Sequence, residues 1–271
     1  MDLQAVLRLF DRDQRQEIDF PGMTREAFPH LVRFVRPAPG TSYILYTDLD
    51  EADVDDVDVD DVDVDDVIDE QVAYFTRLGC SFSWKTFSHD RPADLVERLV
   101  ARGFVADETD AVMVLDVAHA PDSLLAVDTA NVRRLDSPSQ LDQVVAVLKS
   151  VWDQDFTWVH ERLGSHMEIP GYLSVFVAYV DDNPAAAGWT YYNKGSFAGL
   201  WGGSTVAEYR GRGLYTALLA ARVREARLRG VPWLTVDAGS MSRPIVARHG
   251  FEVMTWATDC NWEIPAEDGR S

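Results

Sequence analysis

Apolar positions in the second half of the chain change their spacing several times, and each change predicts an element. Residues 200–206 form a short apolar run typical of a strand, and Gly211 and Gly213 mark a turn after it. Apolar residues then recur at helical spacing, at Leu214, Leu218, Leu219, Val223 and Ala226. Gly230 is placed as the C-cap of this helix, before a further strand at 233–236. The predicted order is strand, glycine-rich turn, helix, strand.

The first half of the chain shows the same order of patterns. Its predicted elements are a strand at 42–46, a helix at 68–79, a strand at 82–87, a helix at 91–104 and a strand at 112–117. Trp84 precedes Gly103 by 19 residues, Trp233 precedes Gly250 by 17 residues, and phenylalanine follows both glycines. We therefore expect two copies of one α/β fold, joined near residues 118–130.

Length and composition allow two ordinary domains. The chain has 271 residues, of which 46% are hydrophobic and 11% aromatic, so global disorder is not expected. The two cysteines, Cys80 and Cys260, have no zinc-ligand or disulfide-framework spacing. The N-terminus lacks the apolar core of a secretory signal, and no apolar run approaches the ~20 residues needed to cross a bilayer. We expect a soluble cytoplasmic protein without a membrane partner.

The formal charge of −20 is concentrated in one segment. Between Asp48 and Glu70 there are 14 acidic residues and no Lys or Arg, and the rest of the chain has a balance of only −6. Residues 53–67 repeat Asp-Val-Asp-Asp-Val three times, without the glycine that a calcium loop needs. We expect a solvated, largely disordered insertion at about residues 50–67, no metal site and, for lack of clustered cations, no nucleic-acid partner. A role in holding a basic partner stays open.

The turn at Gly211 and Gly213 suits a phosphate ligand. The first N–H groups of a helix lack intrahelical partners, the helix dipole adds positive potential, and glycine permits close approach. A P-loop would need Gly-Lys-Ser/Thr, which is absent, and a dinucleotide fingerprint would need glycine in place of Thr216. The turn therefore fits neither of these nucleotide sites.

The sequence from Arg210 to Tyr215, RGRGLY, resembles the acyl-CoA loop of the GNAT (Gcn5-related) family of N-acetyltransferases, although Tyr215 stands where Gly or Ala is usual. Residues 241–254 are similar to the second motif of that family, a helix that ends in Gly-Phe before a strand. The resemblance covers roughly residues 131–265.

This resemblance implies the fold and the ligand. The expected class is α/β (α+β), with two tandem GNAT-like domains, each a central mixed, mainly antiparallel sheet flanked by helices. Residues 1–127 would be a degenerate copy and residues 128–271 the catalytic copy. Acetyl-CoA, as cosubstrate, would lie along Ser204, Thr205 and Val206 with its pantetheine and against Arg210, Gly211, Arg212, Gly213, Leu214, Tyr215 and Thr216 with its phosphates.

The catalytic residues are less clearly marked. The tyrosine usual in the family's second motif falls on Val246, and the strand before the loop carries no carboxylate. The candidates for proton transfer or positioning are Tyr191, Asp237 and Ser240, with Tyr192 and His249 as further candidates.

Residues 151–172 combine aromatic and acidic side chains, a combination that suits a cationic amine. We expect Trp152 and Phe156, four residues apart, to be core contacts on one helix. Asp153, Asp155 and Trp158 stay open as acceptor-site residues.

The first half has no glycine between Gly40 and Gly79 and offers nine aspartates where a pyrophosphate would need N–H groups. We infer that it does not bind CoA. The implied function is acetyl-CoA-dependent transfer of an acetyl group to a primary amine, expected to be that of a small metabolite, by direct attack on the thioester. The protein would be a monomer or a homodimer. The alternative is a non-catalytic, acyl-CoA-binding GNAT-like protein.

Overall fold

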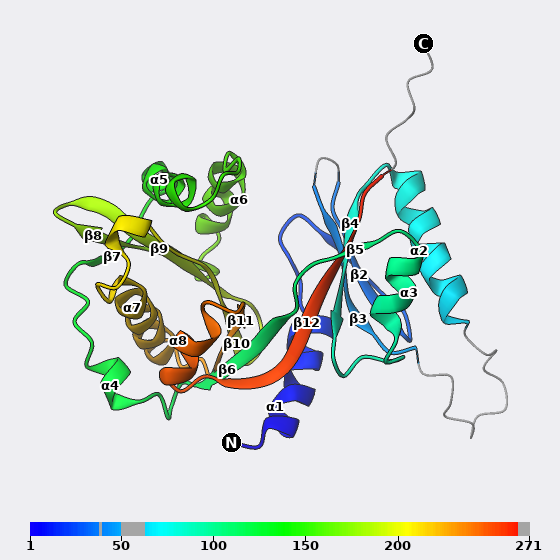
Figure 1. The fold of residues 1–271 in the computed structure, drawn as a ribbon, viewed down its shortest axis with the longest axis horizontal. Coiled ribbons are helices and arrows are strands. Elements are labelled where there is room, and N and C mark those ends of the chain that lie inside the picture. Colours follow the sequence, from blue (N-terminus) through cyan, green and yellow to red (C-terminus); the bar gives the residue numbers. More distant parts are fainter. Residues whose placement is uncertain (38–39, 50–62, 265–271) are drawn as a thin grey trace, which may run out of the picture. The chain divides into compact units, whose positions relative to one another are not determined.

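The computed structural model describes residues 1–37, 40–49 and 63–264, and these form two compact units (Figure 1). The C-terminal unit is Met113–Val253, and the N-terminal unit is Asp2–Val112 together with the residues from Met254 onward. This division by contacts differs from the sequence-predicted boundary at 127/128. Residues 113–127 belong to the C-terminal unit, and the last strand of the chain pairs with a strand of the N-terminal unit.

The N-terminal unit contains a mixed, mainly antiparallel sheet. Its strands, in spatial order, are β1 (Thr24–Ala27), β2 (Leu31–Val35), β3 (Ser42–Thr47), β4 (Phe82–Phe87) and β12 (Glu252–Trp262), and the short β5 (Val105–Ala106) pairs with β12. β3 and β4 run parallel, whereas the other neighbouring pairs are antiparallel. Helix α1 (Leu3–Phe10) continues into a π-helical segment, η1 (Asp11–Gln16).

Helices α2 (Val64–Leu78) and α3 (Leu95–Ala101) cover one face of this sheet (Figure 1). Ile68 and Phe75 are seven residues apart on α2, which places them on one side of the helix. Both are buried in a core cluster with Ile44 of β3 and Trp84 of β4. The core of this unit is therefore built between α2 and the two parallel strands.

The end of the acidic run is an ordered helix start. Asp63 is the N-cap of α2, and its carboxylate accepts a hydrogen bond of 2.9 Å from the N–H of Asp65. Val64 is buried in the core, and Asp65 forms ion pairs of 3.0 Å with both Arg98 and Arg102. The expectation of a disordered insertion is wrong for residues 63–67, because capping and burial offset the like charges. Residues 50–62 lie outside the described part of the chain.

The C-terminal unit has a similar sheet. Its strands, in spatial order, are β6 (Asp110–Asp116), β11 (Trp233–Ala238), β10 (Phe197–Thr205), β9 (Asn183–Tyr192), β8 (Leu173–Val180) and β7 (Val132–Arg134). β10 and β11 run parallel, and the pairs from β10 to β7 are antiparallel. Its helical segments are α4 (Asp122–Leu125), η2 (Pro138–Gln140), α5 (Asp142–Val151), α6 (Trp158–Met167), η3 (Ala207–Tyr209), α7 (Leu214–Leu228) and α8 (Arg243–Arg248).

Alternate residues of β8 show which helices cover which face. Val175 and Val177 pack in a cluster with residues of α5 and α6, whereas Phe176 and Ala178 pack with Leu214 and other residues of α7. Because side chains alternate along a strand, α5 and α6 cover one face of the sheet and α7 covers the other (Figure 1). The predicted mixed, mainly antiparallel sheet flanked by helices is confirmed.

One predicted helical contact is wrong. α5 ends at Val151 and α6 begins at Trp158, so no helix joins Trp152 to Phe156. Phe156 is buried as expected, but 46% of Trp152 is exposed. Asp155 explains the break, because both its carboxylate oxygens accept hydrogen bonds from Thr157 at the start of α6.

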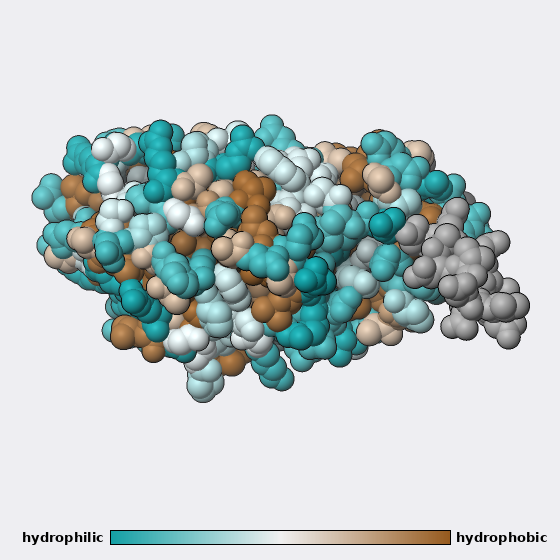
Figure 2. Space-filling model, turned by 90° about the horizontal axis from the view of Figure 1, so that it is seen from below, coloured by the Kyte–Doolittle hydropathy of each residue, from teal (hydrophilic) through white to brown (hydrophobic). Residues whose placement is uncertain are grey.

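Hydrophilic and hydrophobic residues are interspersed over the surface shown in Figure 2. Among the described helices, none is long and apolar enough to span a bilayer.

Candidate active site

The parallel strands β10 and β11 separate after a short stretch of pairing. Their register joins Phe197 to Trp233, Ala198 to Leu234 and Gly199 to Thr235. Residues 200–205 of β10 instead continue along the antiparallel partner β9. The two strands therefore stop pairing, and diverge, beyond Gly199.

β10 contains a bulge within this divergent stretch. Trp201 pairs with Trp189, but the next pair is Ser204 with Ala187, so Gly202 and Gly203 are accommodated opposite a shorter stretch of β9. Gly202 has φ +64°, and a Cβ at this position would collide with the Trp189 ring. The bulge therefore requires glycine both for its backbone conformation and for its packing.

The predicted phosphate loop leads directly into α7. Gly211 and Gly213 have φ of +75° and +78°, and Gly213 is the N-cap of the helix without a side-chain capping bond. Two exposed arginines border this end: the Nε of Arg210 donates to the Thr205 carbonyl at 3.2 Å, and the Arg212 guanidinium lies 5.4 Å from the Tyr209 ring centre. The first turn of α7 contains no acidic residue. This helix end is open, positively charged and suited to an anion.

The other residues predicted to bind acetyl-CoA differ in the groups that they can offer to a ligand. The Ser204 hydroxyl accepts a hydrogen bond of 3.2 Å from the Trp152 indole, which fixes the segment after α5 against β10. Leu214 is buried in the core, so only its backbone is available to a ligand. Tyr215 lies beside Gly203, and Thr216 Oγ1 is 3.4 Å from His249 Nε2.

Two of the three catalytic candidates share one face of the sheet. Tyr191 pairs with Gly199, which in turn pairs with Thr235. Asp237 is two residues beyond Thr235 on β11, so strand alternation directs it to the same face as Tyr191. Ser240 lies in the exposed turn after β11. The structure thus brings Tyr191 and Asp237 to the side covered by α5 and α6, where the strands diverge.

Tyr191 has a partner that the sequence analysis missed. Its hydroxyl is 2.9 Å from Nδ1 of His166, a buried residue of α6. The Tyr172 ring packs against both, with its centre 5.2 Å from that of Tyr191 and 5.3 Å from that of His166. His166 lies on the buried side of a helix with a weak apolar pattern, so periodicity gave no signal for it.

The expected departures from the family pattern are visible in the structure. Val246 is fully buried in α8 and has no polar group to offer a substrate. His249 follows α8 as its C-cap, and burial, followed by repulsion from Arg248, lowers its pKa below the ordinary value. Neither residue supplies an obvious proton donor in the divergent stretch.

The corresponding helix end in the N-terminal unit is closed. The N-terminus of α2 is capped by the Asp63 carboxylate and has Asp65 and Asp66 in its first turn. A carboxylate thus occupies the place where a phosphate would bind, whereas the equivalent place at Gly213 has no such group. The N-terminus of α2 is therefore lined by carboxylates, whereas that of α7 is flanked by arginines, although the two helices hold similar places in their units.

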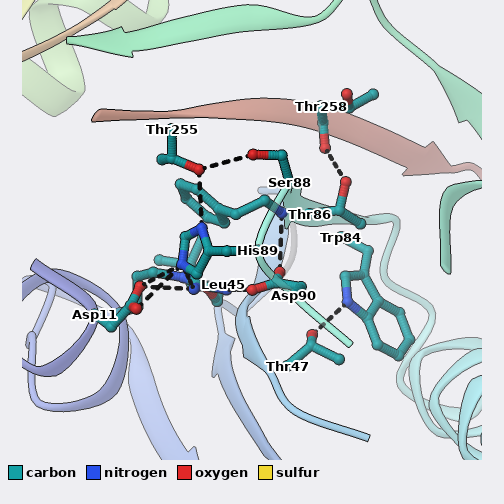
Figure 3. A network of polar contacts seen from close by, with 12 residues as sticks. Asp11, Leu45, Thr47, Trp84, Thr86, Ser88, His89, Asp90, Thr255 and Thr258 are labelled. Carbon is teal, nitrogen blue, oxygen red and sulfur yellow. Dashed lines mark hydrogen bonds and ion pairs between the residues drawn. The ribbon is translucent and has the colours of Figure 1, made fainter. Parts of the chain in front are cut away.

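Side chains and backbone join β3 and β4 beyond their parallel pairing, where Asp48 and Arg91 form an isolated bridge. The Trp84 indole donates a hydrogen bond of 2.8 Å to Thr47 Oγ1, as Figure 3 shows. Beside it, the buried Arg15 guanidinium forms an ion pair of 2.6 Å with Asp90. Trp84 with Thr47 and Arg15 with Asp90 thus satisfy one another's polar groups near the ends of β3 and β4.

Comparison with known proteins agrees with this geometry. Residues 116–240 match the family described as acetyltransferase (GNAT) domain. No curated protein matches the chain.

Solved structures resemble nearly the whole chain. A GCN5-related N-acetyltransferase from Kribbella flavida has 15% identity and a TM-score of 0.64, over 96% of this chain and 94% of its own. A tandem GNAT protein from the clavulanic acid biosynthesis pathway has 13% identity and a TM-score of 0.54, over 99% and 89% of the two chains. A functionally unknown conserved protein from Staphylococcus epidermidis has 11% identity and a TM-score of 0.66, over 95% and 99%. Residues 116–240 therefore match the GNAT acetyltransferase domain, and the whole chain resembles a tandem GNAT protein in its fold.

Proposed function

We propose that the protein is an acetyl-CoA-dependent N-acetyltransferase whose C-terminal copy, residues 128–271, acts on the primary amine of a small metabolite. The match of residues 116–240 to the GNAT acetyltransferase domain supports acetyl transfer from acetyl-CoA in general. The observation that carries the proposal is the open, arginine-flanked N-terminus of α7 at Gly213 beside the divergent strand β10.

The phosphates of acetyl-CoA would accept hydrogen bonds from the backbone between Gly211 and Thr216, with Arg210 and Arg212 adding positive charge. The pantetheine arm would lie along residues 204–206 of the divergent stretch. Thr205 supports this placement, because its buried hydroxyl has no hydrogen-bond partner among the described residues. A buried hydroxyl without a partner is costly, and a ligand amide would satisfy it.

The reaction needs a neutral amine held against the thioester. The amine nitrogen attacks the thioester carbon, the carbonyl becomes an oxyanion, and the C–S bond then breaks to give the amide and the CoA thiolate. The proton lost by the amine nitrogen finally reaches the thiolate sulfur. Asp237 would attract the ammonium form and accept its proton, while Tyr191, hydrogen-bonded to His166, would donate a proton to the leaving sulfur. Ser240 would contact the acceptor from the turn after β11.

The N-terminal copy, residues 1–127, is proposed to be a structural partner that does not bind CoA. The Asp63 cap on α2 supports this proposal, because its carboxylate would repel a pyrophosphate.

A second candidate function is acyl-CoA binding without turnover. The buried Val246, at the position of the family's usual tyrosine, favours it. Turnover with an amine separates the two functions.

The test is calorimetric titration of acetyl-CoA into the wild-type protein and into Gly213→Glu, which places a carboxylate at the α7 N-cap. Gly22→Glu is the matched control, because Gly22 has a similar φ of +73° and equally open surroundings in the N-terminal unit. We expect the wild type and Gly22→Glu to bind and Gly213→Glu not to bind.

Binding would then be followed by screening amines for release of the free CoA thiol. Release supports the transferase, and binding without release for any amine supports the non-catalytic alternative. A folded wild-type protein that does not bind acetyl-CoA would refute both.

A further inference from the structure

Trp201 is an exposed tryptophan on β10, just before the glycines of the bulge. Its antiparallel partner on β9 is Trp189, which is buried in the core cluster with residues of α5 and α6. Directly opposite residues of an antiparallel pair lie on the same face of the sheet, so Trp201 is on the face that carries Tyr191. However, 52% of Trp201 is exposed, against 6% of Trp189. The helices that cover this face therefore leave the Trp201 ring accessible.

The indole of Trp201 lies over Gly199, two residues earlier on β10. A Cβ at Gly199 would come within 2.8 Å of the indole Nε1 and 3.5 Å of its Cδ1. Gly199 is not among the glycines with a positive φ, so its backbone conformation does not require glycine. What requires glycine at this position is the space that the indole occupies.

Gly199 lies between the two strands that carry the proposed proton-transfer residues. Tyr191 of β9 is opposite Gly199 on one side, and Thr235 of β11 is opposite it on the other. Asp237 follows two residues after Thr235 and faces the same way. Neighbouring strands lie about 4.8 Å apart. The exposed indole is therefore one strand away from β9 and one strand away from β11, on the face of Tyr191 and Asp237.

A second exposed indole lies on the same face, beyond the bulge. Trp152 donates a hydrogen bond of 3.2 Å to Ser204, and Ser204 is opposite Ala187, a residue of the core cluster beneath α5 and α6. Exposed apolar surface of this kind marks sites that bind a ligand or a partner. Accessible aromatic surface thus lies on both sides of the bulge, where β10 no longer pairs with β11.

The reaction limits what can lie on the Trp201 ring. An ammonium group would be attracted to the ring as a cation, but the charged form of an amine cannot attack a thioester. An aromatic ring of the acceptor would instead pack on the indole by stacking or edge-to-face contact and leave the amine free to react. A flat, apolar group on the acceptor therefore fits both the surface and the chemistry.

We propose that Trp201 determines acceptor specificity by packing on an aromatic ring of the substrate, so that the preferred acceptor is an arylalkylamine. The ring lies on the indole, and a short alkyl spacer carries the primary amine to Asp237 and Tyr191. This inference rests on the proposed function and names the acceptor class of the same site. The bonds that form and break are those of the acetyl transfer described above.

The test compares two amines with the same number of carbon atoms, phenethylamine, with a flat ring, and cyclohexylethylamine, with a puckered one. Release of the CoA thiol gives kcat/KM for each amine. We expect the wild type to favour phenethylamine by about three- to tenfold, the worth of one aromatic contact. Trp201→Leu should lose this preference, and Trp201→Phe should keep part of it.

Gly199→Ala tests the position of the indole without removing it. The new Cβ lies too close to Nε1, so the indole must shift, and the preference for phenethylamine should fall. Trp256→Leu is the matched control, because it removes an indole that is 37% exposed from β12 in the N-terminal unit. It should leave the preference intact. Calorimetric titration should show that every variant still binds acetyl-CoA, since the loop from Gly211 to Thr216 is unchanged.

The possible failures are distinguishable. A wild type that does not bind acetyl-CoA refutes the proposed function and, with it, the acceptor class. A wild type that binds acetyl-CoA but acetylates phenethylamine no better than cyclohexylethylamine, or not at all, overturns the role of Trp201 alone. A preference that survives in Trp201→Leu or in Gly199→Ala overturns it as well. Loss of acetyl-CoA binding in Trp201→Leu would assign the indole to the cofactor site and also overturn its role in acceptor specificity.

Discussion

The Trp84 indole N–H donates a hydrogen bond of 2.8 Å to Thr47 Oγ1 and joins β4 to β3 beyond their last paired residues, Ile44 and Trp84. Trp84 is fully buried and 2% of Thr47 is exposed, so this bond is inaccessible to water. In the C-terminal unit the corresponding strands diverge after Gly199. A side-chain hydrogen bond thus joins β3 and β4 past their paired residues, whereas β10 and β11 pair only from Phe197 to Gly199.

Thr47→Val should destabilise the protein by about 1–3 kcal/mol, because it leaves a buried indole N–H without an acceptor while keeping the side-chain shape. Urea unfolding followed by tryptophan fluorescence measures the change. A double-mutant cycle, with Trp84→Phe alone and combined with Thr47→Val, measures the interaction energy of this pair. Thr47→Val should lower the free energy of unfolding much less once the indole is absent. The acetyl-CoA affinity should not change. A change in that affinity would contradict a closed N-terminal unit.

Tyr191→Phe should lower kcat by on the order of 10²-fold and leave the KM for acetyl-CoA unchanged, because it removes the hydroxyl that His166 holds. Steady-state release of the CoA thiol, with an amine found by screening, measures both constants. Tyr172→Phe is the control, since this ring belongs to the same aromatic cluster but is not proposed to transfer a proton. Equal losses in the two variants would indicate that the cluster acts only by packing.

His249 should make the stability of the C-terminal unit depend on pH. Burial, followed by repulsion from Arg248, lowers its pKa below the ordinary value of 6.5, so the unfolded chain binds the proton more readily. The stabilising contribution of the neutral imidazole is present above pH 6.5 and is lost as the pH falls through the lowered native pKa.

The wild type should therefore lose more stability between about pH 7.5 and about pH 5.5 than His249→Gln does. Urea unfolding at both pH values measures this difference. The same loss in His249→Gln and wild type would refute the assignment to His249.

Much of the fold could be predicted because its signals are local. The apolar stripe from Leu214 to Ala226, closed by Gly230, predicted α7 to within one or two residues at its end. The predicted strand at 82–87 coincides with β4. Such patterns depend only on neighbours along the chain.

The features that were missed depend on distant neighbours. Asp63 looked like part of a charged repeat, and only the core beneath Val64 and the arginines of α3 make it a helix cap. His166 acquires a role only through Tyr191, 25 residues away. Trp201 belongs to a short apolar run, and the sequence does not show that its indole lies exposed over Gly199.

The route of β12 sets an order for folding during synthesis. Met113–Val253 can complete its own contacts as it emerges, whereas the N-terminal unit needs residues 257–262 to pair with β4. Residues 257–262 must therefore leave the ribosome before the N-terminal unit can complete its sheet. N-terminal domains usually fold first, but here the N-terminal unit completes its sheet last. Until then, the edge of β4 is an unpaired template that is exposed to other nascent chains.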